Sequence, residues 1–281
     1  MNISEMLARN ARMYPTEPAL IELRPSTGVR KEITWREFDE RVNKVANALV
    51  DRGARKGDKI MHWMMNSINW LEAYFGIIRT GAWAVPLNFR FTSQDLKYCA
   101  DIAEAKTMIL GQEFTERLET IRHQLPMIKD YIFVGQNTPK DTENFEDVID
   151  KSSPKPAEVE LNDEDGCGLY FTSGTTGAPK PILITHKNMG SAAIYENYRQ
   201  CMKHHDNFLM LPPLYHTGVM IHWLGCLIVG ARGTILPEVT PQNVFEAVHN
   251  ERVTVVFLLV PWVVDILEAM DRGELKKEHY D

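Results

Sequence analysis

The sequence contains few cysteines, and they are not spaced for a metal site or a redox motif. Cys99, Cys167, Cys201 and Cys226 are far apart, and none belongs to a C-x-x-C pair. Isolated cysteines of this kind are typical of proteins from reducing compartments. We therefore expect reduced, buried thiols and no disulfide framework.

Long apolar runs and an N-terminal signal pattern are also missing. The longest apolar run, 253–264, is interrupted by Thr254 and Pro261 and is too short to cross a bilayer. The first ten residues, MNISEMLARN, lack the charged-then-apolar order of a secretory signal. We expect a cytoplasmic protein with no integral membrane segment, while peripheral membrane contact stays open.

An excess of positive charge is absent as well. The chain has 31 Lys and Arg against 38 Asp and Glu, which gives a net charge of −7. General nucleic-acid binders are usually basic, so no nucleic-acid partner is expected. With 281 residues, 44% hydrophobic and 25% charged, the sequence resembles an ordinary globular protein of one or two domains.

Strand and helix patterns alternate along most of the chain. Periodicity and capping residues, including a Thr34–Glu37 capping box, predict helices over residues 3–14, 34–49, 67–78, 92–103, 114–125, 187–202, 220–229, 241–250 and 261–270. Short apolar runs predict strands over residues 59–65, 82–86, 107–110, 131–134, 168–171, 182–184, 208–211, 234–236 and 254–260. This alternation predicts an α/β fold, with helices layered around largely parallel β-sheets.

A polar, proline-containing segment divides this alternating pattern. Residues 136–165 contain Pro139, Pro154 and Pro156 and many acids, which predicts a surface linker with at most one short helix. We therefore expect a first α/β subdomain over residues 1–135 and a second over residues 166–281.

A loop rich in hydroxyls and glycine lies between two of the expected strands. Residues 170–185 read YFTSGTTGAPKPILIT. Gly174 and Gly177 allow close backbone approach to a ligand, the hydroxyls and loop amides offer donors, and Lys180 adds a mobile positive charge. Such a loop suits a polyanion, above all a nucleotide triphosphate. It is not a Walker loop, because Pro179 and Pro181 flank the lysine and a strand follows instead of a helix.

A histidine follows the expected strand at 208–211. Residues 211–218, LPPLYHTG, combine prolines, an aromatic residue and glycine in a rigid turn. Ligands of open α/β sheets bind beyond the carboxyl ends of strands, so His216 is placed to meet a substrate carboxylate. A histidine that only packs the turn is the alternative. Val219 and Met220 on the next helix could line an acid pocket or belong to the core.

The same region lacks acids and lacks a zinc pattern. Residues 207–237 contain no Asp or Glu to pair a substrate ammonium, so we expect an acid that is uncharged apart from its carboxylate. The spacings of Cys201, His204, His205, His216 and His222 fit no closed zinc site. Magnesium is expected to arrive with a nucleotide instead.

Residues 172–180, TSGTTGAPK, resemble the signature phosphate loop of the adenylate-forming superfamily, which includes acyl-CoA synthetases, luciferases and peptide-synthetase adenylation domains. The pieces ITWREF, ALVDRGARKGD and GAWAVPLN precede it in the order seen in members. The turn that contains His216 resembles an element of acyl-CoA synthetases. One departure is Pro181, where the family usually has glycine; proline removes a backbone donor and fixes φ at about −65°.

This resemblance implies a two-step reaction and a role for each residue. A carboxylate attacks the α-phosphorus of ATP, and coenzyme A then displaces AMP from the acyl adenylate. The residues implied to cradle the β- and γ-phosphates are Thr172, Ser173, Gly174, Thr175, Thr176 and Gly177. Lys180 would neutralise these phosphates, Mg²⁺ would accompany ATP, and His216, Val219 and Met220 would line the pocket of the acid.

Parts of the superfamily pattern are not found before Asp281. The aromatic-Gly-x-Thr-Glu element for adenine and magnesium, the ribose Asp and the C-terminal domain with its adenylation lysine are missing. The resemblance therefore implies the N-terminal portion of an acid–CoA ligase with little adenylation activity by itself. Its substrate would be a fatty, alicyclic or aromatic carboxylic acid.

Two alternatives remain at this stage. One is an adenylating enzyme with a different acceptor, either a carrier-protein-loading or a luciferase-like enzyme. The other is a truncated, non-catalytic binding module. The acid itself and the formation of a homo-oligomer are left open.

Overall fold

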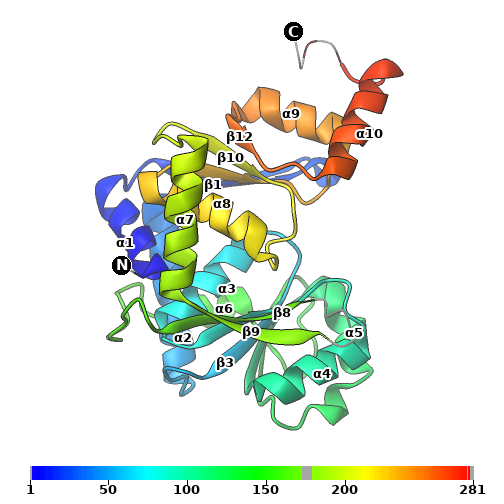
Figure 1. The fold of residues 1–281 in the computed structure, drawn as a ribbon. Helices are drawn as coiled ribbons and strands as arrows, with labels where there is room; N and C mark the ends of the chain where they lie inside the picture. Colours follow the sequence, from blue (N-terminus) through cyan, green and yellow to red (C-terminus); the bar gives the residue numbers. More distant parts are fainter. Residues whose placement is uncertain (1, 173–178, 277, 279–281) are drawn as a thin grey trace. The chain divides into compact units, whose positions relative to one another are not determined.

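Two β-sheets with helices on their faces make up the described part of the computed structural model, residues 2–172, 179–276 and 278 (Figure 1). Most strands run parallel to their neighbours, so the prediction of an α/β fold with largely parallel sheets is confirmed. The chain forms two compact units. Unit 1 comprises residues 1–5, 39–65 and 69–189, and unit 2 comprises residues 6–38, 66–68 and 190–281.

The sheet of unit 2 combines strands from both ends of the chain. Its spatial order is β12 (Val255–Val256), β10 (Asn207–Met210), β11 (Arg232–Ile235), β1 (Pro18–Arg24) and β2 (Val29–Thr34). Neighbouring strands are parallel except β1 and β2, which form an antiparallel hairpin. A 3₁₀ turn, η1 (Pro25–Thr27), joins the two, and Gly28 closes it in the left-handed region with φ 67°. A glycine suits this position because other residues are strained at positive φ.

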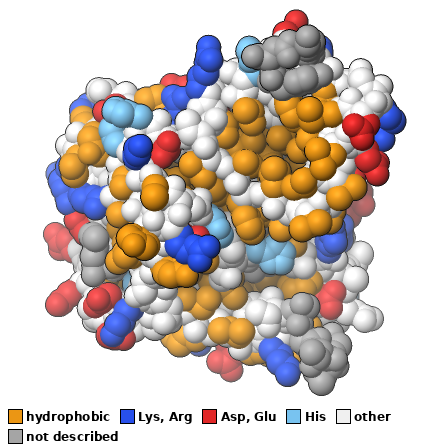
Figure 2. All heavy atoms as spheres, turned by 45° about the horizontal axis from the view of Figure 1, so that its top comes forward, with side chains coloured by type: hydrophobic (Ala, Val, Ile, Leu, Met, Phe, Trp, Pro, Cys, Tyr) orange, Lys and Arg blue, Asp and Glu red, His pale blue; other side chains and the backbone are white. Residues whose placement is uncertain are grey.

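Helices cover both faces of this sheet. On one face α9 (Pro241–Glu251) and α10 (Val260–Asp271) pack on a cluster that includes Leu209 and Leu236. On the other face α8 (Thr217–Val229) brings Trp223 so close to β11 that a Cβ on Gly233 would lie 2.7 Å from its Nε1. Several exposed side chains of α10 are apolar, among them Val260 and Leu267, and hydrophobic side chains gather at the upper right of Figure 2. Unit 2 also contains most of α1 (Ile3–Met13) and α7 (His186–Gln200).

The sheet of unit 1 contains the hairpin that flanks the predicted phosphate loop. Its spatial order is β7 (Glu143–Asn144), β6 (Asp130–Val134), β5 (Thr107–Gly111), β3 (Lys59–Trp63), β4 (Trp83–Pro86), β8 (Gly166–Thr172) and β9 (Lys180–Thr185). Among these strands, β9 is the antiparallel one. The helices and 3₁₀ turns of this region are α2 (Trp35–Asp51), α3 (Ile68–Arg79), α4 (Ser93–Ala103), η2 (Gln112–Phe114), α5 (Thr115–Glu119), η3 (Arg122–Gln124) and α6 (Phe145–Asp150).

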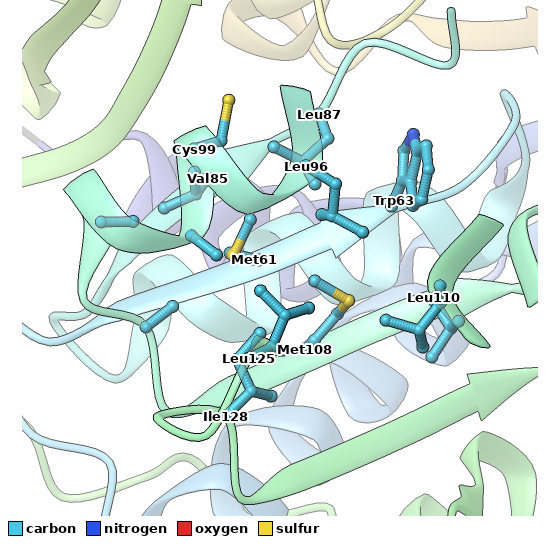
Figure 3. Packing of buried hydrophobic residues seen from close by; sticks show 14 of the residues in the cluster. Met61, Trp63, Val85, Leu87, Leu96, Cys99, Met108, Leu110, Leu125 and Ile128 are labelled. Atoms are coloured by element: carbon cyan, nitrogen blue, oxygen red, sulfur yellow. The ribbon is translucent and has the colours of Figure 1, made fainter. Parts of the chain in front are cut away.

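An apolar core lies between this sheet and α4. Met61 and Trp63 of β3 and Met108 of β5 face Leu96 and Cys99 of α4 (Figure 3). Alternate residues of a strand point to opposite faces, so the remaining strand residues turn toward α3. On that second face His62 contacts Trp70 and Tyr74, with ring centroids 4.6 and 6.1 Å apart.

The two units do not follow the expected subdomains 1–135 and 166–281. Residues 18–34 pair with β11 in unit 2, and β8 and β9 extend the sheet of β3 and β4 in unit 1. Strand pairing is decided by contacts that the order of elements along the chain does not reveal. Within the expected linker 136–165, the structure has the short strand β7 and the short helix α6, which confirms the one helix predicted there.

Several element boundaries agree with the sequence and some do not. The Thr34–Glu37 capping box is confirmed, because the Glu37 amide donates to Thr34 Oγ1 at 3.2 Å and the Thr34 amide to Glu37 Oε2 at 2.7 Å. The helix expected over 114–125 is broken into η2, α5 and η3, and the strand expected over 254–260 is limited to β12. The hairpin of β1 and β2 was not predicted.

Three of the four cysteines are buried, as expected. Burial raises the pKa of Cys99 and of Cys167 to about 12, and raises that of Cys226 as well. Cys201 differs from the expectation because it is exposed, at the end of α7. In the part of the chain that the structure describes, no helix is both long and apolar enough to cross a bilayer.

Candidate functional site

The β8–β9 hairpin of unit 1 presents the two ends of the predicted phosphate loop. Thr172 lies opposite Lys180 in the ladder, and its hydroxyl is 3.5 Å from the Lys180 carbonyl oxygen. Both residues are exposed at the open end of the hairpin. The loop members Ser173, Gly174, Thr175, Thr176 and Gly177 lie outside the described residues. The structure therefore brings together the first and last members of the predicted site, Thr172 and Lys180.

Two buried tyrosines join this hairpin to α3. Tyr170 of β8 donates a hydrogen bond of 3.0 Å from its hydroxyl to that of Tyr74 on α3, and both side chains are buried. Desolvation raises the pKa of Tyr74 above its ordinary value and has the same effect on Tyr170. Both phenols therefore stay neutral, and the buried hydrogen bond fixes the strand two residues before Thr172.

Pro181 follows Lys180 on an edge strand. It stands opposite Phe171, and β9 is the outermost strand of the unit 1 sheet. Proline is tolerated on edge strands because no further strand needs its missing N–H. The departure from the family's usual glycine is thus compatible with the hairpin, and it fixes φ directly after the lysine.

A buried asparagine holds the turn that contains His216 in unit 2. The Asn66 side chain donates to the Pro212 carbonyl oxygen at 2.9 Å and accepts from the Leu214 amide at 2.8 Å. The His216 amide in turn donates to the Pro213 carbonyl oxygen at 3.0 Å. Asn66 precedes the turn by more than 140 positions, so this contact could not be predicted from the motif.

We expect Asn66→Ala to lower the free energy of unfolding by about 1–2 kcal/mol, because it leaves the buried Leu214 amide and Pro212 carbonyl without partners. Urea denaturation measures the change. Asn47→Ala is the matched control, since Asn47 also donates to two carbonyl oxygens, of Ser153 and Lys155, but at an exposed site. An equal loss in both variants would contradict the proposed role of Asn66.

His216 occupies the N-cap position of α8. Its backbone is extended, with φ −85° and ψ 131°, and its side chain makes no capping hydrogen bond. The side chain is exposed, and its ring lies 4.3 Å from that of Tyr215. The residue thus lies beyond the carboxyl end of β10, as the sequence predicted.

In the first turns of α8, some side chains face the core and others are accessible. Val219 and Met220, which were expected to line a pocket, have no exposed surface. Gly218 and His222, one turn apart, are half-buried, and the His222 ring stacks on Phe257 with centroids 4.5 Å apart and planes 18° apart. Because residues four apart lie on the same side of a helix, this pair could have been predicted from the sequence.

His222 is held in place by two partners. Its Nδ1 lies 2.7 Å from the Gly218 carbonyl oxygen, and its Nε2 lies 3.4 Å from a carboxylate oxygen of Glu196 on α7. Glu196 therefore brings a carboxylate to a segment, 207–237, that has none of its own. Sequence reasoning missed this contact because it joins two helices.

The histidines of this region do not form a metal centre in the part of the chain that the structure describes. The His204 ring lies against that of Tyr14, with centroids 4.0 Å apart, and its Nε2 lies 3.0 Å from a carboxylate oxygen of Glu17. No group of three or more His, Cys, Asp or Glu residues among the described positions could hold an ion.

The two elements, a Ser/Thr/Gly loop between β8 and β9 and a histidine turn after β10, agree with the comparison to known proteins. The AMP-binding enzyme family model matches residues 7–281. The chain belongs to the AMP-binding enzyme family. Two curated relatives of this AMP-binding protein are CoA ligases. The medium/long-chain-fatty-acid/3-oxocholest-4-en-26-oate–CoA ligase of Mycolicibacterium smegmatis is 26% identical over 98% of this chain and 53% of its own length. The crotonobetaine/carnitine–CoA ligase of Citrobacter koseri is 26% identical over 99% and 54%.

Solved structures of the family show the same fold. The anthranilate CoA ligase AuaEII, in complex with anthranoyl-AMP, superposes with a TM-score of 0.91 at 26% identity, over 99% of this chain and 54% of that one. The N-terminal domain of FACL13 from Mycobacterium tuberculosis gives a TM-score of 0.87 at 24% identity, over 99% of this chain and 68% of that one. The chain thus spans about half the length of the curated relatives it matches.

Proposed function

We propose that this chain supplies the N-terminal portion of an ATP-dependent acid–CoA ligase. Such an enzyme joins a carboxylate to the α-phosphorus of ATP, releases pyrophosphate, and transfers the acyl group from AMP to the thiol of coenzyme A. The observation that carries the proposal is the match of the AMP-binding family over residues 7–281, in relatives whose names are those of CoA ligases. The acid is proposed to be fatty, alicyclic or aromatic.

The hairpin of unit 1 would hold the phosphates. Thr172 and Lys180 meet at its open end, so a loop between them offers donors next to a positive charge. In this proposal the loop members Ser173, Gly174, Thr175, Thr176 and Gly177 hold the β- and γ-phosphates together with Thr172. Negative charge accumulates on phosphate oxygens in the first step, and Lys180 would stabilise it by electrostatics and positioning.

The β10–α8 turn of unit 2 would hold the acid. His216 is exposed at the turn that Asn66 fixes, and it would orient the substrate carboxylate. Gly218, His222 and Phe257 would contribute to the adjoining wall, because they are partly accessible and His222 stacks on Phe257. Val219 and Met220 would support this wall from the core.

Magnesium would enter with ATP rather than occupy a site of its own. Mg²⁺ binds phosphates with one or two carboxylates and keeps several waters. When bound, the ion would neutralise phosphate charge beside Lys180.

The proposal predicts that Lys180→Ala weakens the binding of MgATP to this chain by about tenfold or more. A charge-assisted hydrogen bond contributes about 1.5–3 kcal/mol, and about 1.4 kcal/mol corresponds to a factor of ten. Isothermal titration calorimetry measures the change. Lys187→Ala is the control, because Lys187 also belongs to unit 1, close in sequence, but is paired with Glu164. Equal affinities in the two variants would refute the role of Lys180.

The same preparation tests the reaction. We expect residues 1–281 by themselves to catalyse little ATP–pyrophosphate exchange with carboxylic acids, since they correspond to about half the length of the related CoA ligases. Robust exchange would show that residues 1–281 contain all that adenylation requires.

A further inference from the structure

A cavity of about 510 Å³ opens at one edge of the unit 1 sheet. It lies at the amino ends of the neighbouring parallel strands β3, β5 and β6, and residues at the ends of α2 and α4 also line it. Cavities that bind small molecules have volumes of about 300–1,000 Å³, so this one is large enough for a metabolite. All of its lining residues belong to unit 1.

This cavity is separate from the candidate functional site. Strands β3, β4 and β8 run parallel, so the last residue of β8, Thr172, lies at the carboxyl-end edge of the sheet. Lys59, the first residue of β3, lies at the amino-end edge and lines the cavity. A ligand in this cavity would therefore occupy the opposite edge of the sheet from the proposed phosphate loop.

Three lysines stand side by side along the amino-end edge and line the cavity. Lys59 and Lys106 each come directly before a residue of the pair that joins β3 to β5, and Lys129 comes in the same way before β6. Neighbouring strands are about 4.8 Å apart, so these flexible side chains can reach one bound group together. A fourth basic residue of the cavity, Arg52, is already paired with Glu143 at 2.7 Å.

The three lysines are not neutralised by carboxylates. Within the part of the chain that the structure describes, none of them forms an ion pair, and the Lys106 ammonium makes no hydrogen bond. Lys59 lies over the ring of Trp83, 5.3 Å from its centroid, and Lys129 donates to the Pro126 carbonyl oxygen at 2.6 Å. Like charges on adjacent strands repel each other, so an anion bound among these lysines would be stabilised.

The cavity also has acidic groups that can accept hydrogen bonds. Glu104, which lines it, is the C-cap residue of α4, where the helix dipole adds partial negative charge. Asp58 accepts from the Arg55 amide at 2.8 Å, and Asp130 accepts from the Thr107 hydroxyl at 3.4 Å. An ionised carboxylate has several lone pairs, so each can accept further hydrogen bonds. A ligand that has donors as well as an anionic group would therefore suit this cavity better than a simple anion.

We propose that this cavity binds a small organic phosphate with several hydroxyl groups, a sugar phosphate. A phosphate monoester has a charge of about −1.5 to −2 near pH 7 and several strong acceptor oxygens, which suits three lysines better than the single charge of a carboxylate. The phosphate would lie among Lys59, Lys106 and Lys129. The sugar hydroxyls would donate to the carboxylates of Asp58 and Glu104.

Isothermal titration calorimetry of the chain with ribose 5-phosphate, ribose and inorganic phosphate tests the proposal. We expect ribose 5-phosphate to bind at least about tenfold more tightly than either of the others, because ribose lacks the anionic group and inorganic phosphate lacks the hydroxyls. Equal affinities for ribose 5-phosphate and inorganic phosphate would overturn the proposed ligand class. No detectable binding of ribose 5-phosphate would overturn the site itself.

Substitutions of lysines locate the phosphate. Lys106→Met should weaken the binding of ribose 5-phosphate by about tenfold or more, whereas Lys106→Arg, which retains the charge, should keep most of the affinity. Lys151→Met is the matched control, because Lys151 is also an exposed lysine of unit 1 but lies at the end of α6, outside the cavity. Equal losses in Lys106→Met and Lys151→Met would show attraction to surface charge in general and would overturn the site.

A glycine substitution tests the acidic groups. Glu104 has φ 50°, a backbone conformation that glycine adopts without strain, so Glu104→Gly should fold normally. We expect this variant to bind ribose 5-phosphate about tenfold more weakly and inorganic phosphate no more weakly than the wild type. An equal loss for both ligands would contradict the assignment of the hydroxyls to Glu104.

The two proposed phosphate sites can be separated by their lysines. Lys180→Ala should leave the binding of ribose 5-phosphate unchanged, and Lys106→Met should leave the binding of MgATP unchanged. Loss of ribose 5-phosphate binding in Lys180→Ala but not in Lys106→Met would place the sugar phosphate at the hairpin of β8 and β9 and overturn the proposal. Because these titrations require no ligase activity, the cavity and the proposed function can fail independently.

Discussion

We expect Arg41→Met to lower the free energy of unfolding by about 3–5 kcal/mol, because it leaves a buried carboxylate without its positively charged partner. Arg41 on α2 donates two hydrogen bonds to Glu72 on α3, at 2.5 and 2.9 Å, and Glu72 has no exposed side-chain surface. Arg41 also donates to Glu146 of α6, at 2.8 and 3.0 Å. Burial by itself lowers the pKa of the guanidinium, but these hydrogen bonds and the nearby carboxylates together outweigh it and hold the pKa above its ordinary value, so the arginine stays charged. Equilibrium urea denaturation measures the loss.

The matched variants separate the buried charge from the loss of an ion pair as such. The double variant Arg41→Met with Glu72→Leu should regain most of the stability, since a buried ion pair can often be replaced by apolar side chains without cost. Lys97→Met removes the exposed pair of Lys97 and Asp101 and should cost less than about 1 kcal/mol. A double variant no more stable than Arg41→Met alone would contradict the explanation.

This buried ion pair bears on the candidate site through α3. Glu72 and Tyr74 are two residues apart on that helix, and Tyr74 accepts the hydrogen bond from Tyr170 of β8. Fixing α3 therefore helps to fix the strand that ends at Thr172. A buried polar network thus supports the strand that leads to the proposed phosphate-binding loop.

Local patterns in the sequence predicted the frame of the site well. The apolar runs around residues 170–185 predicted β8 and β9, and these strands place Thr172 opposite Lys180. The Thr34–Glu37 capping box formed as expected, because both partners lie within one helical turn. Such features depend on neighbours in sequence, whose geometry the backbone determines.

Long-range contacts could not be predicted in the same way. The position of β1 between β11 and β2 depends on pairing across about 200 residues, which the order of elements along the chain does not reveal. Asn66 holds the His216 turn from a distant position, and Glu196 reaches His222 from another helix. One local signal for the β1–β2 hairpin was present, since Gly28 supplies the positive φ of its turn.

Buried histidines give the second large effect, a loss of stability on mild acidification. His62 on β3 is fully buried, and neither of its ring nitrogens has a hydrogen-bond partner among the described residues. Burial lowers its pKa from 6.5 to about 3, and burial likewise lowers that of His186 to about 4. Both imidazoles are therefore neutral in the folded protein throughout the range between pH 7 and about pH 5.

The direction in which the free energy of unfolding changes with pH follows from proton binding. Below about pH 6.5 the unfolded chain binds protons at these two histidines that the folded protein does not bind, so the stability present above this pH decreases as the pH falls. Between pH 7 and about pH 5 each histidine should account for a loss of about 2 kcal/mol. Most carboxylates remain ionised in this interval, which isolates the contribution of the histidines.

We expect His62→Leu to remove about half of this acid-dependent loss, because leucine fills the site beside Trp70 and Tyr74 and has no proton to bind. The contribution of His186 should remain. Free energies of unfolding from urea titrations at pH 7 and at about pH 5 give the difference for each protein. His123→Gln removes an exposed histidine and should leave the acid response of the wild type unchanged. If His62→Leu lost as much stability on acidification as the wild type, the imidazole of His62 would have to accept a proton in the folded state, and its burial on β3 would not control its pKa.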